Sequence, residues 1–190
     1  MKLYKYRDTS NIKFLLDILV NKRLHAASYQ KMKNPMEEHY LDQSAKLNPE
    51  FRAALHREKD HYGICSLYKE PHNHLLWSHY ADDHRGLAFG VTVDDPDCML
   101  REVKYSDMSA ISSLTTDHPA DATIQMLSHK LDIWDYEKEH RAFVKQKQYV
   151  GVKVHEVIFG RRADAREKSF LTKMIKKVSL DIEVKDELDK

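Results

Sequence analysis

The chain has few of the residues that mark secreted, membrane-bound or low-complexity proteins. Its 190 residues include two cysteines, five prolines and five glycines. Two cysteines are too few for a disulfide framework, and no apolar run approaches the roughly 20 residues that a membrane helix needs. The N-terminal stretch MKLYKYRDTS has no apolar segment typical of a signal peptide. We therefore expect a cytoplasmic protein with no membrane partner.

Net charge is almost absent as well. The 31 basic side chains balance 30 acidic ones, which removes any compositional argument for a polyanionic partner. A nucleic-acid surface would have to be local. One basic cluster near the C-terminal end could provide it, although such clusters are more often a solvated helix face: Arg161, Arg162, Arg166, Lys173, Lys176 and Lys177.

The hydrophobic patterns predict one α+β domain over residues 1–190, with a mixed, mainly antiparallel sheet and flanking helices. Strands are expected at KLYKYR, RLHAASY, YGICSLY, LAFGVTV, REVKYS, EHRAFVKQ, VHEVIFG and LDIEV. Helices are expected over residues 12–19, 48–59, 74–84, 124–134 and 171–178. Gly86 should tolerate the positive φ at the end of the third helix, and Trp77 on that helix should be buried.

Twelve histidines raise the question of a metal site. His79 and Asp83 would share a helix face at the four-residue spacing that metal-binding pairs use. No third ligand is identifiable from the sequence, so a polar helix face with Trp77 and Tyr80 packed inward is the favoured interpretation. No Gly-rich phosphate loop, nucleophile elbow, paired CxxC or kinase signature is present. No metal cofactor is expected.

The stretch YEKEHRAFV places Glu137, Glu139 and Arg141 at every second position, so a strand would carry them on one face. On a solvent face they would form an ordinary surface ladder. In a catalytic site Arg141 would pair with Glu137 and support substrate binding. On a half-buried strand the carboxylates would stand at the mouth of a cleft. There they could stabilise an oxocarbenium-like sugar and accept a proton.

Almost the whole chain resembles a bacterial family known as domain of unknown function twenty-nine seventy-one. The resemblance lies in LYKYR, NPME, LLWSHYADDHRGLAFGV, WDYEKEHR and VHEVIFG. The chain departs from the family at residues 34–36, where an Asn-Asp-Pro stretch is frequent, and at His140, where an aromatic is frequent. Members look similar to proteins of phage-defence and abortive-infection loci. The resemblance therefore implies a phage-defence or toxin effector.

The chain also distantly resembles ADP-ribosyltransferases of the arginine-serine-glutamate type. Arg7 ends LYKYR, Ser28 ends LHAAS, and Glu137 and Glu139 form the Glu-x-Glu pair. This resemblance implies NAD as a substrate, with Arg7 on its pyrophosphate and Ser28 beside it. Glu139 would stabilise the cationic ribose as nicotinamide leaves, and Glu137 would orient or deprotonate a nucleic-acid or protein acceptor.

Four residues around the central helix are candidates for contacts with a base or with the adenine of NAD, because aromatic and guanidinium planes stack on any base: Trp77, His79, Tyr80 and Arg85. We predict that Arg7, Ser28 and Glu139 lie around one cleft. Two alternatives stay open. A metal-dependent nuclease needs a cluster of carboxylates and histidines. A non-enzymatic antitoxin or immunity-type binding module needs a broad apolar or charged surface.

Overall fold

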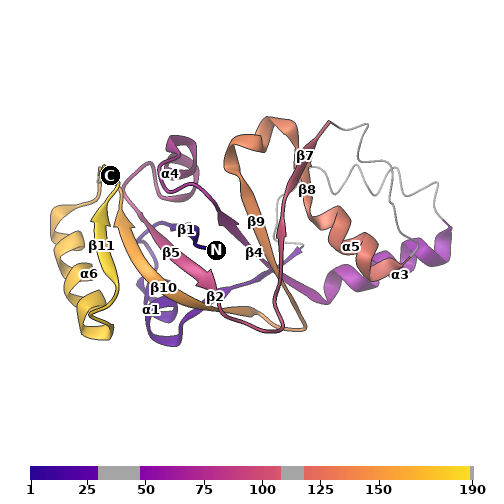
Figure 1. Ribbon diagram of the computed structural model, residues 1–190, viewed down its shortest axis with the longest axis horizontal. Helices are drawn as coiled ribbons and strands as arrows, with labels where there is room; N and C mark the ends of the chain where they lie inside the picture. The colour runs from indigo at the N-terminus through magenta and orange to yellow at the C-terminus, as the bar shows by residue number, and fades with distance from the viewer. Residues whose placement is uncertain (30–47, 108–117, 189–190) are drawn as a thin grey trace. The chain divides into compact units, whose positions relative to one another are not determined.

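The computed structural model describes residues 1–29, 48–107 and 118–188 (Figure 1). The chain divides into two compact units, each assembled from separate stretches. The first unit contains residues 1–24, 66–96 and 150–190, and the second contains residues 25–65 and 97–149. The NPME motif lies outside the described residues, and a single domain over residues 1–190 stays a prediction.

The first unit is built on a mainly antiparallel sheet. β1 (Leu3–Arg7) pairs antiparallel with β5 (Leu87–Val93), which in turn pairs antiparallel with β10 (Tyr149–Phe159). β11 (Glu183–Asp186) lies parallel to β10, as Figure 1 shows. β2 (Arg23–His25) also pairs with β10, and β1 meets the end of β4 (Tyr62–Tyr68). The predicted α+β class with a mainly antiparallel sheet is confirmed.

Three helices belong to this unit: α1 (Ile12–Asn21), α4 (His74–Tyr80) and α6 (Ala165–Val178). α6 begins where the Asp164 side chain accepts the backbone N–H groups of Arg166 and Glu167, which satisfies donors that a helix start leaves unpaired. Its inner face buries Leu171 and Ile175. The rest of the helix is mostly polar, so amphipathic spacing places it on the surface of the unit.

Trp77 anchors α4 in the core, as predicted. Its side chain is fully buried, its ring meets Tyr6 edge-on at 5.1 Å, and its Nε1–H donates to the carbonyl of Pro71 at 2.8 Å. The helix ends at Tyr80, four residues before the predicted end. The expected positive φ at Gly86 was wrong, since three residues before it take that conformation instead. Gly86 is required for space, because a Cβ there would lie 2.2 Å from a main-chain oxygen. β5 follows at once, so the predicted entry into a strand is confirmed.

The second unit contains further strand pairs and helices. The start of β4 pairs with β3 (Ala27–Ser28), and β9 (Glu139–Lys145) pairs with β6 (Met99–Glu102). β7 (Lys104–Ser106) and β8 (His129–Leu131) form a separate parallel pair. α3 (Pro49–Asp60), α5 (Pro119–Leu127) and the 3₁₀ helix η4 (Asp132–Glu137) complete it. A cluster of buried apolar residues forms its core: Tyr62, Ile64, Ile124, Leu127 and Phe143.

Three predicted elements are divided in the structure. The predicted helix over residues 124–134 was wrong beyond Leu127, where α5 ends and β8 and η4 follow. RLHAASY forms two short strands, β2 and β3, and REVKYS is shared between β6 and β7.

Candidate functional site

The predicted glutamate pair lies in the second unit and is almost completely buried. Glu139 begins β9, but Glu137 is the last residue of η4, and Lys138 between them has a left-handed φ of 45°. The expectation that all three charges lie along one strand was therefore wrong for Glu137. Glu137 and Glu139 are 0% and 1% exposed. Their burial also contradicts both a solvated surface ladder and a pair of carboxylates at a cleft mouth.

Lys130 and Arg141 compensate these two carboxylates. The Nζ atom of Lys130 lies 2.5 Å from Glu137 Oε2 and 3.0 Å from Glu139 Oε2. Arg141 Nε donates to Glu139 Oε1 at 2.9 Å, and Arg141 Nη1 donates to the carbonyl oxygen of Leu127 at the end of α5. The sequence assigned Arg141 to Glu137, whereas the structure pairs it with Glu139 and pairs Glu137 with Lys130. We call these four charged residues the buried charge cluster.

Tyr105 closes this cluster on the side of β7. Its hydroxyl accepts the backbone N–H of Glu139 at 2.8 Å. Burial raises the pKa of the Tyr105 phenol well above its ordinary value of 10, and the nearby carboxylates add to the shift. The phenol is therefore a neutral partner at any physiological pH. Lys130, Arg141 and Tyr105 thus hold Glu139 in place within the unit.

Arg7 and Ser28, the residues predicted to bind NAD, belong to different units. Arg7 ends β1 of the first unit, and Ser28 ends β3 of the second. Ser28 lines a polar cavity of about 310 Å³ whose other lining residues do not include Glu139: His25, Ala26, Asp60, His61, Tyr62, Gly63, Gln146, Lys147 and Gln148. The expectation that Arg7, Ser28 and Glu139 surround one cleft stays a prediction.

The residues predicted to contact a base differ in their exposure. Trp77 is fully buried, so it offers no ring face to a ligand. Tyr80 is 37% exposed and stacks on Tyr68 with ring centroids 5.4 Å apart. His79 is exposed beside Tyr80, and Arg85 binds Asp82 through two hydrogen bonds of 2.9 Å. Tyr80 is therefore the stacking surface that this helix presents.

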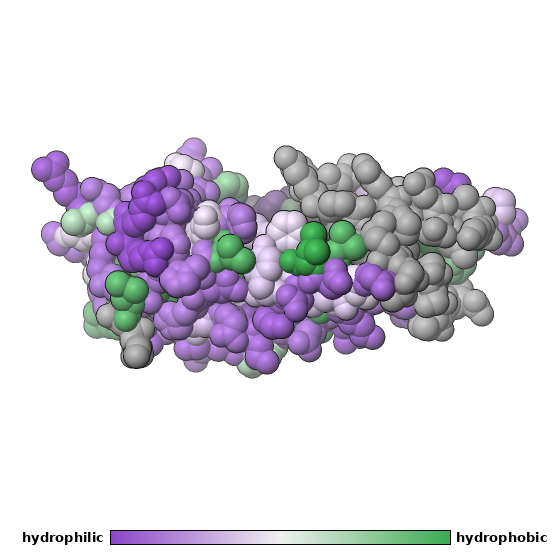
Figure 2. Space-filling model, turned by 90° about the horizontal axis from the view of Figure 1, so that it is seen from above, coloured by the Kyte–Doolittle hydropathy of each residue, from purple (hydrophilic) through white to green (hydrophobic). Residues whose placement is uncertain are grey.

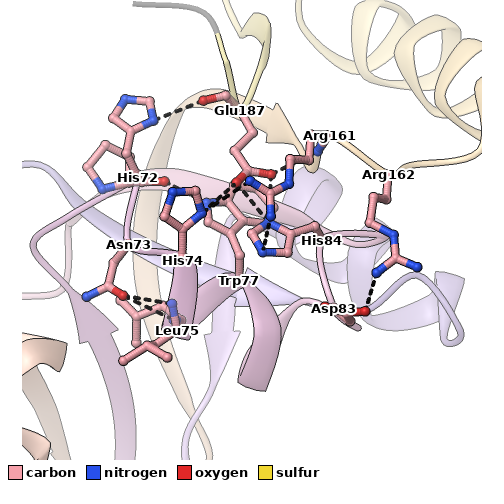
Figure 3. Close-up of polar contacts among 12 residues, drawn as sticks. His72, Asn73, His74, Leu75, Trp77, Asp83, His84, Arg161, Arg162 and Glu187 are labelled. Atoms are coloured by element: carbon pink, nitrogen blue, oxygen red, sulfur yellow. Dashed lines mark hydrogen bonds and ion pairs between the residues drawn. The ribbon is translucent and has the colours of Figure 1, made fainter.

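His79 and Asp83, whose four-residue spacing would suit a metal-binding pair, belong to no group of three metal-ligating side chains within the described residues. The carboxylate of Asp83 binds the guanidinium of Arg162 (Figure 3). Within the described parts of the chain, the histidine and carboxylate ligand atoms that do come together are those of His74, His84 and Glu187, all within 4.8 Å of one another. These three residues, with Arg161, form what we call the His84–Glu187 cluster.

Glu187 is the anchor of the His84–Glu187 cluster (Figure 3). Its side chain is 3% exposed, and its two carboxylate oxygens lie 2.8 and 2.9 Å from Nδ1 of His84. Oε2 also accepts the backbone N–H of Arg161 at 2.9 Å. The main chain of Glu187 is tied in place as well, because its N–H donates to Phe159 and its carbonyl contacts His72 Nδ1 at 3.1 Å.

The guanidinium of Arg161 fixes the protons of the cluster. Its Nη2 lies 3.2 Å from His84 Nε2, and its Nη1 lies 3.3 Å from His74 Nδ1. Guanidinium nitrogens can only donate, so both imidazole nitrogens must accept. The remaining proton of His84 is therefore on Nδ1, where the carboxylate of Glu187 accepts it. One chain of hydrogen bonds runs from Glu187 through His84 and Arg161 to His74.

A strained loop holds the ring of His84 in this position. Asp82, Asp83 and His84 have φ values of 47°, 50° and 65°, a left-handed conformation that costs a non-glycine residue about 1–2 kcal/mol. The rings of Trp77 and His84 stack with centroids 6.1 Å apart and 11° between planes. Gly160 packs against the loop so closely that a Cβ would lie 2.1 Å from the His84 carbonyl oxygen.

The cluster is buried at one end and accessible at the other. His84 and Glu187 are each 4% exposed, whereas the His74 side chain is 68% exposed and Arg161 lies on the surface. A guanidinium carries five N–H groups, and two of those of Arg161 donate to the imidazoles, which leaves three without a partner among the described residues. The arrangement places an imidazole lone pair directly beside an exposed anion-binding group.

The partners of His84 could not be predicted from the sequence. Arg161 and Glu187 lie 77 and 103 residues away from His84. The signals available were a histidine directly before the Arg-Gly turn and a glutamate just after the last predicted strand. Neither signal indicates that His84 and Glu187 contact each other, because these two residues meet only when β11 pairs with β10.

The surface adds two findings. The face drawn in Figure 2 is mostly hydrophilic, and apolar residues form small separate groups over its described part. Several members of the basic cluster of the C-terminal region are engaged within the chain, since Arg162 binds Asp83 and Lys176 donates to the carbonyl oxygens of Leu180 and Ile182.

Across the described residues, no helix has both the length and the apolar character needed to cross a membrane.

Comparisons with known proteins find no counterpart for this architecture. No protein-family model matches the chain, and neither a curated protein nor a solved structure matches it significantly. The resemblances to the domain of unknown function and to ADP-ribosyltransferases stay predictions, and the functional argument rests on the geometry of the His84–Glu187 cluster.

Proposed function

We propose that the chain cleaves RNA by general acid–base catalysis at the His84–Glu187 cluster. One observation carries this proposal: His84 has its proton on Nδ1 and its lone pair on Nε2, which faces the guanidinium of Arg161 at 3.2 Å. A phosphate oxygen that accepts from Arg161 would lie beside that lone pair. A base beside a bound anion is what proton transfer near a phosphodiester requires.

The reaction needs only groups that the cluster supplies. When a phosphodiester takes over the contacts of Arg161, Nε2 of His84 accepts the proton of the 2′-hydroxyl, and Glu187 stabilises the resulting imidazolium. The 2′-oxygen bonds to phosphorus while the bond from phosphorus to the 5′-oxygen breaks. His74, protonated from solvent once it is released from Arg161, gives a proton to the leaving oxygen. The products are a 2′,3′-cyclic phosphate and a 5′-hydroxyl end.

RNA suits this site better than DNA. The nucleophile is then part of the substrate, so the protein does not have to activate a water molecule. The two imidazoles stand with ring centroids 5.7 Å apart, one on each side of the Arg161 contacts. Tyr80, on the same helix as His74, presents a partly exposed ring on which a neighbouring base would stack.

Glycosyl transfer from NAD stays a separate prediction. Its proposed catalytic carboxylate, Glu139, is 1% exposed and contacts both Lys130 and Arg141. To act on a ribose it would have to be uncovered and released from these cations. Incubation with labelled NAD and with DNA, RNA or protein acceptors tests this hypothesis independently of RNA cleavage.

The decisive experiment uses a DNA oligonucleotide that contains a single ribonucleotide. We expect cleavage on the 3′ side of the ribonucleotide, a cyclic phosphate product, and full activity in the presence of EDTA. His84→Asn and Arg161→Ala should each reduce the rate about 10²–10⁴-fold, the range typical of a lost acid–base group. His118→Asn and Arg52→Ala, exposed residues of the second unit, serve as controls that keep activity.

Three outcomes would contradict the proposal. Equal cleavage of an all-deoxy oligonucleotide would remove the role of the 2′-hydroxyl. Loss of activity with EDTA would favour the metal-dependent nuclease that the sequence left open. Full activity of His84→Asn, in a protein whose circular dichroism matches that of the wild type, would place the chemistry elsewhere.

A further inference from the structure

We propose that His74, His84 and Glu187 form a Zn²⁺ site that closes when the side chain of Arg161 leaves it. Zinc and Arg161 would then compete for the same two imidazoles. The inference goes beyond RNA cleavage and does not depend on it, because it concerns only which cation the three side chains hold.

The distances fit a four-coordinate zinc ion. Zn–N and Zn–O bonds of about 2.0–2.2 Å in tetrahedral geometry place ligand atoms about 3.3–3.6 Å apart. Glu187 oxygens lie 2.8 and 2.9 Å from His84 Nδ1, and Glu187 Oε1 lies 3.9 Å from His74 Nδ1. These separations bracket the required value. His74 is the most exposed ligand, so its ring has room to move the remaining fraction of an ångström.

Groups outside the three ligands already hold them in orientation, as good metal sites require. Oε2 of Glu187 accepts the backbone N–H of Arg161, and this bond remains when the Arg161 side chain swings away. The stacked ring of Trp77 fixes the plane of His84. Two of the three ligands are therefore held in orientation, and zinc requires His84 Nδ1 and the Glu187 carboxylate to move slightly apart from their 2.8 Å contact while the exposed third ligand moves in.

The proton positions explain why zinc and Arg161 exclude each other. Zinc on Nδ1 of His84 displaces the proton that Glu187 now accepts, and the neutral ring then carries its proton on Nε2. An Nε2–H cannot accept from Arg161 Nη2, and a zinc-bound His74 Nδ1 cannot accept from Nη1. Both contacts of the guanidinium are lost together. The lone pair that would act as a base in RNA cleavage is lost with them, so zinc should also inhibit that reaction.

The chemistry of the ligands selects the metal. Two imidazoles and one carboxylate suit Zn²⁺, whereas Mg²⁺ and Ca²⁺ prefer oxygen ligands throughout. Three protein ligands leave the fourth position of the ion for water or another small ligand. We therefore expect binding of Zn²⁺ at neutral pH and no measurable binding of Mg²⁺ at the same concentration.

Isothermal titration of the full chain with ZnCl₂ tests the inference through four proteins. Wild type should bind one ion at this site. Arg161→Ala removes the competing cation and should bind zinc about tenfold more tightly. His74→Ala removes one of the three ligands and should weaken binding at least tenfold. Arg162→Ala is the matched control: it removes an adjacent exposed arginine that contacts Asp83 instead of the imidazoles, and its affinity should equal that of the wild type.

The response of Arg161→Ala separates a built site from scattered binding to twelve histidines. Equal or weaker zinc affinity in Arg161→Ala, or unchanged affinity in His74→Ala, would overturn the inference. His74 is exposed, so its variant should fold even if changes at His84 or Glu187 do not. Zinc binding without RNA cleavage would keep this site and reject the nuclease. RNA cleavage without zinc binding would do the reverse.

Discussion

Two charged networks of this chain have similar members but opposite surroundings. In the second unit, Glu139 lies between Lys130 and Arg141 and all the carboxylates are buried. In the first unit, Glu187 and His84 are equally buried, but their chain of hydrogen bonds ends at an exposed arginine and an exposed histidine. The charged groups around Glu139 pair with one another. The network around Glu187 can exchange its outer partners, Arg161 and His74, for a ligand.

The two networks differ in how their buried charge is connected to solvent. A buried carboxylate held between two cations is costly to disturb, because removal of one partner leaves an uncompensated charge in the core. A buried base whose outer neighbour reaches solvent can accept a proton at the surface while its orientation is fixed from beneath. Burial of the glutamate alone does not distinguish the two, because Glu139 and Glu187 are buried almost equally.

The largest effect that we predict comes from breaking the closed network. Arg141→Met keeps the length of the side chain but leaves Glu139 with less compensation and the Leu127 carbonyl without its donor. We expect the free energy of unfolding to fall by about 3–5 kcal/mol. Urea unfolding followed by circular dichroism measures this value from the transition midpoint and slope.

The matched comparison is His74→Ala at the open end of the other network. Its side chain is 68% exposed, so stability should change by about 0.5 kcal/mol or less. Similar losses in Arg141→Met and His74→Ala would show that the two networks do not differ in the way their burial indicates. The glutamate replacement Glu139→Gln should follow Arg141→Met, because it leaves Lys130 and Arg141 with less compensation.

The second effect tests the rigidity of the open network. Gly160→Ala would place a Cβ 2.1 Å from the carbonyl oxygen of His84, and a main-chain atom must move to relieve this contact. We expect a loss of about 1–3 kcal/mol in stability, as for other overpacked sites. RNA cleavage should fall more than substrate affinity, because the displaced ring of His84 no longer meets the 2′-hydroxyl. An unchanged rate would show that the loop does not position His84.

Local patterns predicted much of the fold. β1, β4, β5 and α3 begin and end within a few residues of the segments expected, because their signals lie within the segments. Asn48 shows this directly, since its side chain accepts the backbone N–H of Glu50 beside the predicted start at Pro49. The same reasoning failed after Leu127. Apolar residues continue at helical spacing there, but the chain turns into β8 so that Lys130 can reach the two glutamates.

The site was less predictable than the fold. The charged residues of YEKEHR show this limit, because sequence does not reveal whether a charged face is buried against opposite charges. The His84–Glu187 cluster was not predicted because its members come from three separated stretches of the chain, residues 74–84, Arg161 and Glu187. Whether a histidine has a carboxylate behind it and solvent in front of it depends on strand pairing more than a hundred residues away along the chain.

The third effect concerns a network between these extremes. Glu156 is 2% exposed, but its cations Lys2 and Lys185, at 2.5 and 2.7 Å, reach solvent. Burial alone would raise the pKa of Glu156, but hydrogen bonds from Lys185, Lys2 and Tyr4 lower it to about 2. A carboxylate with a depressed pKa stabilises the fold above its ordinary value of 4.5, and the stabilisation is lost as pH falls toward about 2.

Glu156→Gln should therefore be less stable than wild type at pH 7, by about 3 kcal/mol at most. The difference should stay constant down to about pH 5 and then shrink toward pH 2, as the wild type loses its advantage. Urea midpoints of both proteins at a series of pH values measure this convergence. A difference that does not depend on pH would mean that the size of the side chain matters and its charge does not.

The smallest effect comes from Arg162, the neighbour of Arg161 in sequence. Its ion pair with Asp83 joins side chains that are 52% and 49% exposed, and such surface pairs contribute little because water and salt screen them. The backbone N–H of Arg162 donates to the His84 carbonyl at 3.0 Å and survives the change to alanine. A double-mutant cycle of Arg162→Ala with Asp83→Asn, which tolerates the left-handed φ of Asp83, should give a coupling below about 0.5 kcal/mol that vanishes in 1 M salt. A coupling that reached about 2 kcal/mol and persisted in salt would show that the loop of His84 is held from its exposed side. The network around His84 would then be held on its exposed side as firmly as the network around Glu139 is held in the core. The two networks would no longer differ in their freedom to exchange partners, which RNA cleavage requires.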